Sequence, residues 1–263
     1  MASQPAPASV LPLLYNDLVP LSSVDHASWR ARPQDSVPYL RTVHAIPITV
    51  EEFPLAQRHY PIIFSVGDNP VPLALMALNE GMNVFVDEAG KFRENAYLPA
   101  YIRRYPFLLA KLRPDTDELS LCFDPTTRAI GPFDDGDPLF ADGKPTEVVT
   151  RILQFCEQFE AAAANTGKFM EELAAAQLLM EGEVSIQVDG QPQPYIYRGF
   201  QMIDETKLRD LRGDQLRKMM QNGMLPLIHA HLFSLSLVEG LFARAQQQGV
   251  LPAQGAPNAG APA

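Results

Sequence analysis

Hydrophobic positions in the first half of the chain come in short runs separated by turn residues, which is the pattern of β-strands. Residues 62–66, 73–78 and 82–86 form three such runs, and we expect strands of one sheet, two of them buried on both faces. Residues 36–48 contain β-branched and aromatic residues interrupted by two prolines. This predicts one or two edge strands, because proline cannot donate to a central ladder.

A hairpin is predicted next along the chain. Residues 107–112 and 119–123 are both largely apolar and flank a polar turn, so we expect them to pair. Residues 130–143 are rich in aspartate, glycine and proline, which predicts a loop. The β-rich part of the chain is therefore expected to cover residues 36–143.

The hydrophobic period becomes helical after this loop. Between residues 147 and 180, apolar side chains recur at helical spacing, which predicts one long amphipathic helix or two helices broken near Thr166 and Gly167. A hairpin with an Asp-Gly turn is expected within residues 183–203. The last helix is expected at residues 225–245.

Local signals indicate the shorter helices. Thr49 and Glu52 have capping-box spacing, so a short helix should begin there. Residues 97–104 predict another short helix, in which a proline is tolerated in the first turn. Two aspartates, Asp204 and Asp214, are expected to cap two further helices.

The order of these elements predicts an α+β fold. We expect a β-rich N-terminal half packed with a helical C-terminal half, residues 144–245, that carries an inserted β-hairpin. The absence of regular strand–helix alternation argues against a doubly wound sheet. The expected organisation is a single domain at residues 13–245. Residues 1–12 and 246–263 are expected to be disordered, because their composition cannot bury enough apolar surface.

Composition and charge limit the classes of binding partner and the cellular location that we expect for this protein. The 263 residues carry a net charge of -10, and an acidic surface repels both nucleic acid and anionic lipid. The longest apolar stretch, residues 224–238, contains a proline and two histidines and is shorter than a bilayer requires. No basic residue precedes the apolar part of the N-terminus. We therefore expect a cytoplasmic protein.

No set of residues points to a known metal or catalytic site. Cys122 and Cys156 lie in apolar runs, so buried free thiols are expected rather than a disulfide. His229 and His231 would diverge by about 200° on a helix and cannot hold one metal from one face. The chain has no nucleophile elbow, phosphate loop or dinucleotide motif. We expect no metal and no cofactor; whether the protein is an enzyme stays open, with a non-enzymatic role favoured.

Candidate binding residues gather in the densest run of aromatic and arginine residues, residues 83–107. Arg103 and Arg104 would diverge by about 100° on a helix, so at most one points into a given cleft. An arginine framed by tyrosines can bind a carboxylate or phosphate, or it can clamp its own domain through Asp87 or Asp124. The candidate binding residues are Asp87, Tyr97, Tyr101, Arg103, Arg104, Tyr105 and His231.

His231 has two interpretations. It falls on the apolar stripe of the last predicted helix, together with Leu227, Ile228 and Leu235. That position is typical of a core histidine bonded to a backbone carbonyl. The alternative is a ligand or general base in a pocket.

Several stretches resemble one known family. YLPAYIRRYPF, residues 97–107, resembles the signature of the bacterial SapC-like family. The resemblance continues in order through FPLAQRHYPIIF, LSLCFD, PLFADGKPT, GFQMIDETKL and NGMLPLIHAHLFSL. The family takes its name from a surface-layer gene cluster, and its members often lie near genes for TonB-dependent receptors and flavin-dependent halogenase-like proteins. A peptide-transporter permease shares only the name.

Three functions follow from the resemblance and the residues together. The favoured one is a non-enzymatic binding or accessory protein linked to surface-layer or TonB-dependent-receptor systems, with a protein or a small anionic ligand as its partner. The second is an enzyme with an unrecognised site near Asp87, Arg103, Arg104 and His231. The third is a component of the surface layer itself, which would place the protein at the cell surface and would require export.

Overall fold

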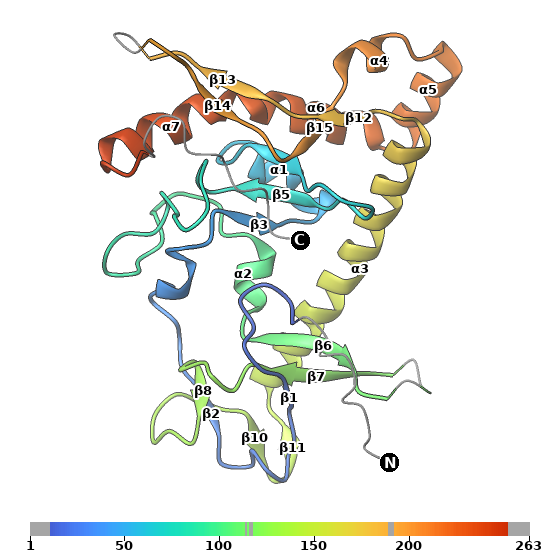
Figure 1. Ribbon diagram of the computed structural model, residues 1–263. Helices are drawn as coiled ribbons and strands as arrows, with labels where there is room; N and C mark the ends of the chain where they lie inside the picture. The colour runs from blue at the N-terminus through green and yellow to red at the C-terminus, as the bar shows by residue number, and fades with distance from the viewer. Residues whose placement is uncertain (1–10, 114, 116–117, 189–191, 252–263) are drawn as a thin grey trace, which may run out of the picture. The chain divides into compact units, whose positions relative to one another are not determined.

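The computed structural model describes residues 11–113, 115, 118–188 and 192–251. The expectations for residues 1–10 and 252–263 lie outside the described residues. Strands dominate the first half of the chain and helices the second, so the α+β prediction is confirmed (Figure 1). Every strand pairing among the described residues is antiparallel.

The chain forms two compact units. Of the described residues, those within 11–35 and 104–158 belong to the first unit, and those within 36–103 and 159–251 to the second. This grouping does not follow the expected division into residues 36–143 and 144–245. It arises because segments that are distant in the sequence supply strands to the same sheet.

The predicted hairpin is present in the first unit. Strand β6, Phe107–Lys111, pairs with β7, Leu119–Phe123, and β1, Val19–Pro20, adds to the other edge of β7. The apolar side chains of these strands meet others from later in the chain. The buried cluster consists of Phe107, Phe123, Ile130, Leu139, Phe140, Val149 and Cys156.

The prediction of a plain loop at residues 130–143 is wrong. This segment contains three two-residue strands: β8, Ile130–Gly131; β9, Asp137–Pro138; and β10, Phe140–Ala141. β8 and β9 flank β2, Arg30–Ala31, and β10 pairs with β11, Lys144–Pro145. Strands this short show no alternation that a sequence pattern can reveal, and turn residues dominate the local composition.

The second unit contains a five-stranded sheet in the order β12, β15, β4, β5, β3. Two of the three predicted runs supply β4 and β5, which are buried along their whole length. β3 contains Pro47 and lies at the edge, as predicted for a strand with a proline. The bounds are Ala45–Pro47 for β3, Ile62–Phe64 for β4, Pro72–Leu75 for β5, Leu179–Glu181 for β12 and Gln201–Ile203 for β15.

The third predicted run, residues 82–86, is a buried loop and not a strand, so that prediction is wrong. The Asn83 amide Nδ2 donates to the backbone oxygens of Leu40, at 3.1 Å, and Val43, at 3.0 Å. Its Oδ1 accepts from the Phe85 backbone N–H at 2.9 Å. An asparagine side chain that satisfies local backbone groups competes with a ladder, and here only one bridge remains, between Val86 and Phe92.

One unbroken helix, α3, spans Glu147–Ala175. Thr166 does not break it, because its hydroxyl donates to Ala162 O inside the helix and accepts from the Val50 backbone N–H. The helix was expected to continue to residue 180, which is wrong. Gln177 has a φ of 54°, and this left-handed residue turns the chain into β12.

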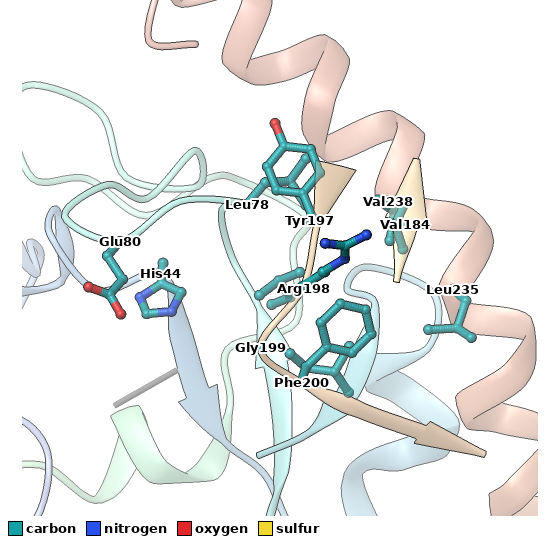
Figure 2. Close-up of a pocket in the computed structure, with 12 residues that line it drawn as sticks. His44, Leu78, Glu80, Val184, Tyr197, Arg198, Gly199, Phe200, Leu235 and Val238 are labelled. Atoms are coloured by element: carbon teal, nitrogen blue, oxygen red, sulfur yellow. The ribbon is translucent and has the colours of Figure 1, made fainter. Parts of the chain in front are cut away.

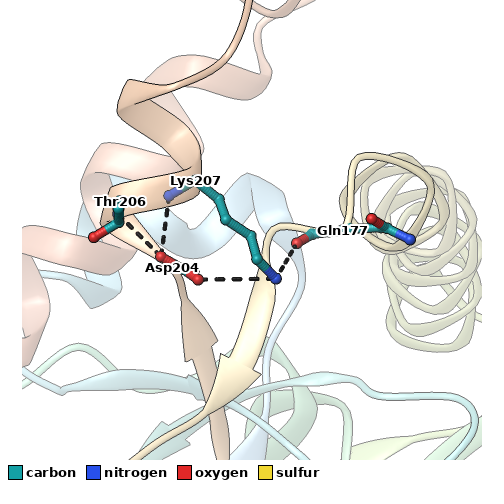
Figure 3. A network of polar contacts seen from close by, with 4 residues as sticks. All are labelled: Gln177, Asp204, Thr206 and Lys207. Atoms are coloured by element: carbon teal, nitrogen blue, oxygen red, sulfur yellow. Dashed lines mark hydrogen bonds and ion pairs between the residues drawn. The ribbon is translucent and has the colours of Figure 1, made fainter.

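The capping signals are confirmed at two positions and wrong at a third. Thr49 and Glu52 form a capping box at the turn before α1, Phe53–Ala56. Asp204 caps α4, Glu205–Arg209, by accepting from the backbone of Thr206 and Lys207 (Figure 3). Asp214 lies inside the first turn of α5, Gly213–Gln221, whose N-cap is Arg212.

The remaining predicted helix and hairpin are shorter than expected. Helix α2 covers only Ala100–Arg104. The first three residues of the predicted helix, up to Pro99, precede it, and a proline is well tolerated where a helix begins. The hairpin consists of β13, Val184–Ile186, and β14, Tyr195–Tyr197. The stretch after Tyr197 leaves this hairpin and joins the five-stranded sheet as β15. The expected Asp-Gly turn lies outside the described residues.

The last helical run consists of α6, Met224–Ser234, a 3-10 turn, Leu235–Leu237, and α7, Val238–Gln247. It therefore extends into the tail that was expected to begin at residue 246. Met224–Gln247 is long and apolar enough to cross a membrane by length and composition alone, whereas the sequence predicted a shorter stretch. One side of this run bonds to the sheet, because the Ser234 hydroxyl accepts from the Ile62 N–H at 2.8 Å.

Candidate functional site

An arginine-lined cavity of about 230 Å³ lies within the second unit. Three parts of the chain line it: the residues after α1, the loop segment at residues 85–96, and α7 with the turn before it. Its lining consists of Arg58, His59, Phe85, Arg93, Glu94, Asn95, Ala96, Leu237, Gly240 and Arg244. We call this the arginine cavity.

Local structure places each arginine at the cavity. The Arg58 N–H bonds to Leu55 O at 3.2 Å and so continues the turn of α1. The Arg93 N–H bonds to Phe85 O at 2.8 Å, beside the single bridge at Val86. The Arg244 guanidinium lies over the Phe85 ring, 4.9 Å from its centroid. One turn before Arg244 is Gly240, where a Cβ would meet no atom within 4 Å.

The cavity concentrates positive charge. Among the described residues, none of the three arginines forms an ion pair. Glu94, the one acid in the lining, is paired with the Lys91 ammonium at 2.8 Å. Burial and the charge of Arg93 lower the pKa of Arg244. Burial and the charges of Arg58 and Arg244 lower the pKa of His59. In both cases burial is the larger cause of the lowered pKa, and the neighbouring positive charges add to it.

An aromatic floor fixes the position of Arg244. Tyr60 is fully buried, and its ring centroid lies 4.7 Å from that of Phe85. The Tyr60 hydroxyl donates to Tyr97 O at 2.5 Å. Burial raises the pKa of Tyr60, so its hydroxyl stays protonated and keeps this bond. Tyr60 therefore holds the ring on which Arg244 rests.

A second hollow of about 380 Å³ shares Phe85, Arg93 and Glu94 with the arginine cavity. Asp87, one of the predicted site residues, lines this hollow and accepts a bond from the Lys91 N–H at 2.8 Å. Asp87 thus shapes the turn that holds Lys91. The lining of the arginine cavity does not include it.

Tyr97 and Arg103, also predicted, lie in a network around Glu52. Glu52 is 5% exposed, and its Oε1 accepts from the Tyr97 hydroxyl at 3.0 Å and from the Ala100 N–H at 2.7 Å. Its Oε2 accepts from the Thr49 N–H and hydroxyl. Arg103 donates to the Tyr97 hydroxyl at 3.3 Å. Burial and the Glu52 carboxylate raise the pKa of Tyr97 to about 12. This network binds α2 to the turn before α1.

The other predicted residues occupy separate places. Tyr101 is buried with its ring edge toward Phe159, at a centroid distance of 6.2 Å. Arg104 and Tyr105 belong to the first unit, where both lie near the ring of Tyr15, at 5.9 Å and 5.3 Å. Asp124, considered as an arginine partner, accepts bonds from the backbone of Asn16 and Thr126. The predicted residues therefore do not form one site within either unit.

His231 has the contacts of a core histidine. Its Nδ1 donates to Ile62 O at 2.8 Å, and its Nε2 accepts from the Ile203 N–H at 3.1 Å. It bridges β4 and β15 where their own pairing ends. Burial lowers the pKa of His231 to about 4, so the ring is neutral at pH 7. Both ring nitrogens are used, which leaves neither available for a ligand.

A further pocket lies between the sheet and the α6–α7 run (Figure 2). Its cavity volume is about 40 Å³, which is room for a few water molecules at most. His44 and Glu80 lie together on one side of it, and Phe200 and Leu235 on the other. Burial lowers the pKa of His44, whereas Glu80 opposes that shift. The small volume makes this pocket a packing feature rather than a ligand site.

The sequence did not predict the arginine cavity, because no motif joins residues 58, 93 and 244. One signal was available: Leu237, Gly240 and Arg244 are spaced as one face of a helix. Arg58 also lies in the stretch FPLAQRHYPIIF, and Arg93 in the arginine-rich run at residues 83–107. Among the described residues, no group of three or more His, Cys, Asp or Glu could hold a metal ion.

Comparisons with known proteins identify the family. No curated protein and no solved structure matches the chain. The SapC family model matches residues 21–241, which is most of the chain. That range includes Arg58 and Arg93 and ends three residues before Arg244. The chain belongs to the SapC family.

Proposed function

We propose that this SapC family member is a binding protein that holds an anionic group, a carboxylate or a phosphate, in the arginine cavity. The observation that carries the proposal is the convergence of Arg58, Arg93 and Arg244 on one cavity without an ion pair to any described residue. A guanidinium presents parallel N–H donors that match the oxygens of a carboxylate or a phosphate.

The electrostatics support a bound anion. Burial and, to a smaller extent, the charge of Arg93 both disfavour the charged form of Arg244 and lower its pKa. An anion bound in the cavity would offset the repulsion between the arginines. The volume of about 230 Å³ lies below the usual range for ligand pockets, roughly 300–1,000 Å³. It therefore suits a small anion or the charged end of a larger ligand.

A binding role agrees with the accessory function that the family resemblance implied, in a surface-layer or TonB-dependent-receptor system. The partner would be a protein or a small anionic molecule. A cytoplasmic location is supported by Cys122 and Cys156, which are both buried and not joined in a disulfide. The alternative of an enzyme that uses His231 lacks support, because both of its ring nitrogens bond to the backbone.

Calorimetry with inorganic phosphate and with citrate tests the proposal. We expect binding to the wild type and a loss of at least tenfold in affinity in Arg244→Gln and Arg93→Gln. Arg209→Gln is the matched control, since this exposed arginine pairs with Glu205 outside the cavity. The proposal fails if neither anion binds the wild type, or if Arg209→Gln weakens binding as much as Arg244→Gln does.

A further inference from the structure

Exposed apolar side chains approach the arginine cavity along the α6–α7 run. Phe233 is 68% exposed. It is followed by Leu237, Gly240 and Arg244, at intervals of four, three and four residues, and these three line the cavity. Such spacing places all four on one face of a helix. His229 lies one turn earlier, with its ring 5.8 Å from that of Phe233.

This face stays continuous through the 3-10 turn between the two helices. Leu235, Leu237 and Val238 all have right-handed helical φ and ψ. The chain therefore stays helical between Phe233 and the cavity, and the tighter winding of the 3-10 turn rotates the face by only a fraction of a turn. We call Phe233, Leu237, Gly240 and Arg244 the outer stripe.

A second element repeats the arrangement. Leu55 in α1 is 48% exposed and lies three residues before Arg58, which is helical spacing for one face. α1 packs on α6. Two neighbouring elements thus each lead from an exposed apolar side chain to an arginine of the cavity.

We propose that the occupant of the arginine cavity is an acidic side chain of a partner protein, within a segment whose neighbouring apolar side chain rests on Phe233 and Leu55. This inference rests on the proposed function of the cavity. A free small anion would need the arginines but would make no use of the exposed apolar residues beside them. A peptide segment that carries both kinds of side chain is complementary to both.

The net charge of the chain favours a protein over a lipid surface. At -10, the molecule is repelled as a whole by an anionic bilayer, whereas a short acidic segment meets only the local positive field of the cavity. The same repulsion disfavours nucleic acid.

The geometry sets the spacing within the partner segment. With a rise of about 1.5 Å per residue, Phe233 lies roughly 6 Å along the helix axis from Leu237 and roughly 16 Å from Arg244. An extended peptide advances about 3.3 Å per residue. The acidic and apolar side chains of the segment should therefore be separated by about two to five residues.

A labelled synthetic peptide provides the test. The probe is a serine-glycine peptide with two adjacent glutamates and one leucine three positions away, and its affinity is measured by fluorescence anisotropy. Two control peptides replace the leucine with serine or the glutamates with glutamine. Competition by inorganic phosphate gives the affinity for a small anion. Vesicles of equal parts phosphatidylglycerol and phosphatidylcholine test a lipid surface.

We expect the wild type to bind the probe about tenfold more tightly than it binds phosphate or the leucine-to-serine peptide, because one apolar side chain is buried. Phe233→Ser should remove this advantage and leave phosphate affinity unchanged, and Leu55→Ser should reduce it. Arg244→Gln should weaken the binding of both the probe peptide and phosphate. Both apolar residues are exposed, so the variants should fold.

Three results would overturn the inference. The probe could bind no more tightly than phosphate, Phe233→Ser could leave probe binding unchanged, or the vesicles could bind while the probe does not. In the first two results, phosphate binding that depends on Arg244 would leave the proposed function standing. If neither phosphate nor the probe binds the wild type, both proposals fail.

Discussion

Glu52 and Arg244 are charged residues of the same unit that are surrounded in opposite ways. Glu52 is almost fully buried, and its carboxylate accepts from Thr49, Tyr97 and Ala100. Arg244 is half-buried, and it pairs with no carboxylate of the described residues. A charge that the protein satisfies itself stabilises the fold, whereas a cluster of like charges left unpaired is suited to an external partner.

The two surroundings are connected through one residue. Tyr97 donates from its hydroxyl to Glu52 and accepts at its backbone oxygen from Tyr60, which supports Phe85 under Arg244. Rigidity created around Glu52 therefore extends to the floor of the arginine cavity. Such support is what holds binding groups in a fixed geometry.

Removing the Glu52 side chain should have the largest effect on stability. Glu52→Ala leaves buried donors of Thr49, Tyr97 and Ala100 without an acceptor, so the free energy of unfolding should fall by about 3–5 kcal/mol. Urea denaturation measures this change. Glu51→Ala is the control, because Glu51 is exposed. A loss below about 1 kcal/mol in Glu52→Ala would break the comparison.

His231 is a second buried side chain whose hydrogen bonds are satisfied within the protein, and its contribution to the free energy of unfolding depends on pH. Its pKa is about 4 in the folded protein and 6.5 ordinarily, so between these values the unfolded state binds more protons. The free energy of unfolding should be greatest above pH 6.5 and should fall by about 3 kcal/mol as the pH drops to 4. His231→Gln should flatten this part of the profile. An unchanged slope in that variant would assign the effect to other groups.

Sequence patterns predicted the elements that repeat over several residues and missed those that depend on distant partners. The hairpin of β6 and β7, the helix α3 and the Asp204 cap are local, and each carries its signal in a few neighbouring residues. The loop at Asn83 was predicted as a strand because it is a short apolar run bounded by turn residues. Its asparagine bonds to Leu40 and Val43, which no local pattern shows.

The same distinction applies to the site. The Tyr97 and Arg103 cluster was visible as a dense run, but its acceptor is Glu52, which the sequence marked only as a cap. The arginine cavity needs residues 58, 93 and 244 to meet. Convergence of single residues from three parts of the chain requires the fold itself.

Replacing Arg244 should change stability little, in contrast to Glu52. Arg244→Gln removes a repelled charge but also its contact with Phe85, so the free energy of unfolding should change by about 1 kcal/mol or less. Any gain should shrink as salt is added, because salt screens the repulsion between arginines. Urea denaturation at low and high salt measures both. A loss as large as that of Glu52→Ala would make Arg244 a structural residue.

The smallest expected effect is the pH dependence of anion binding through His59. Its pKa is lowered, so the ring is neutral at pH 7 and gains a proton only as the pH falls below 6.5. Sulfate affinity should then rise by a few fold, since the added charge attracts the anion. Sulfate is the useful probe because it does not titrate in this range. A rise that persists in His59→Gln would come from another group.

The interleaving of the two units has a consequence for the order in which the protein can fold during synthesis. Residues 1–35 emerge first from the ribosome, but their unit is complete only when residue 158 has followed. The backbone N–H of Ile62, in the central strand β4, donates to the hydroxyl of Ser234, which lies 172 residues later in the chain. Buried strands such as β4 and β5 must therefore wait for their partners while synthesis continues, and nascent chains of this protein should depend on chaperones that shield apolar segments.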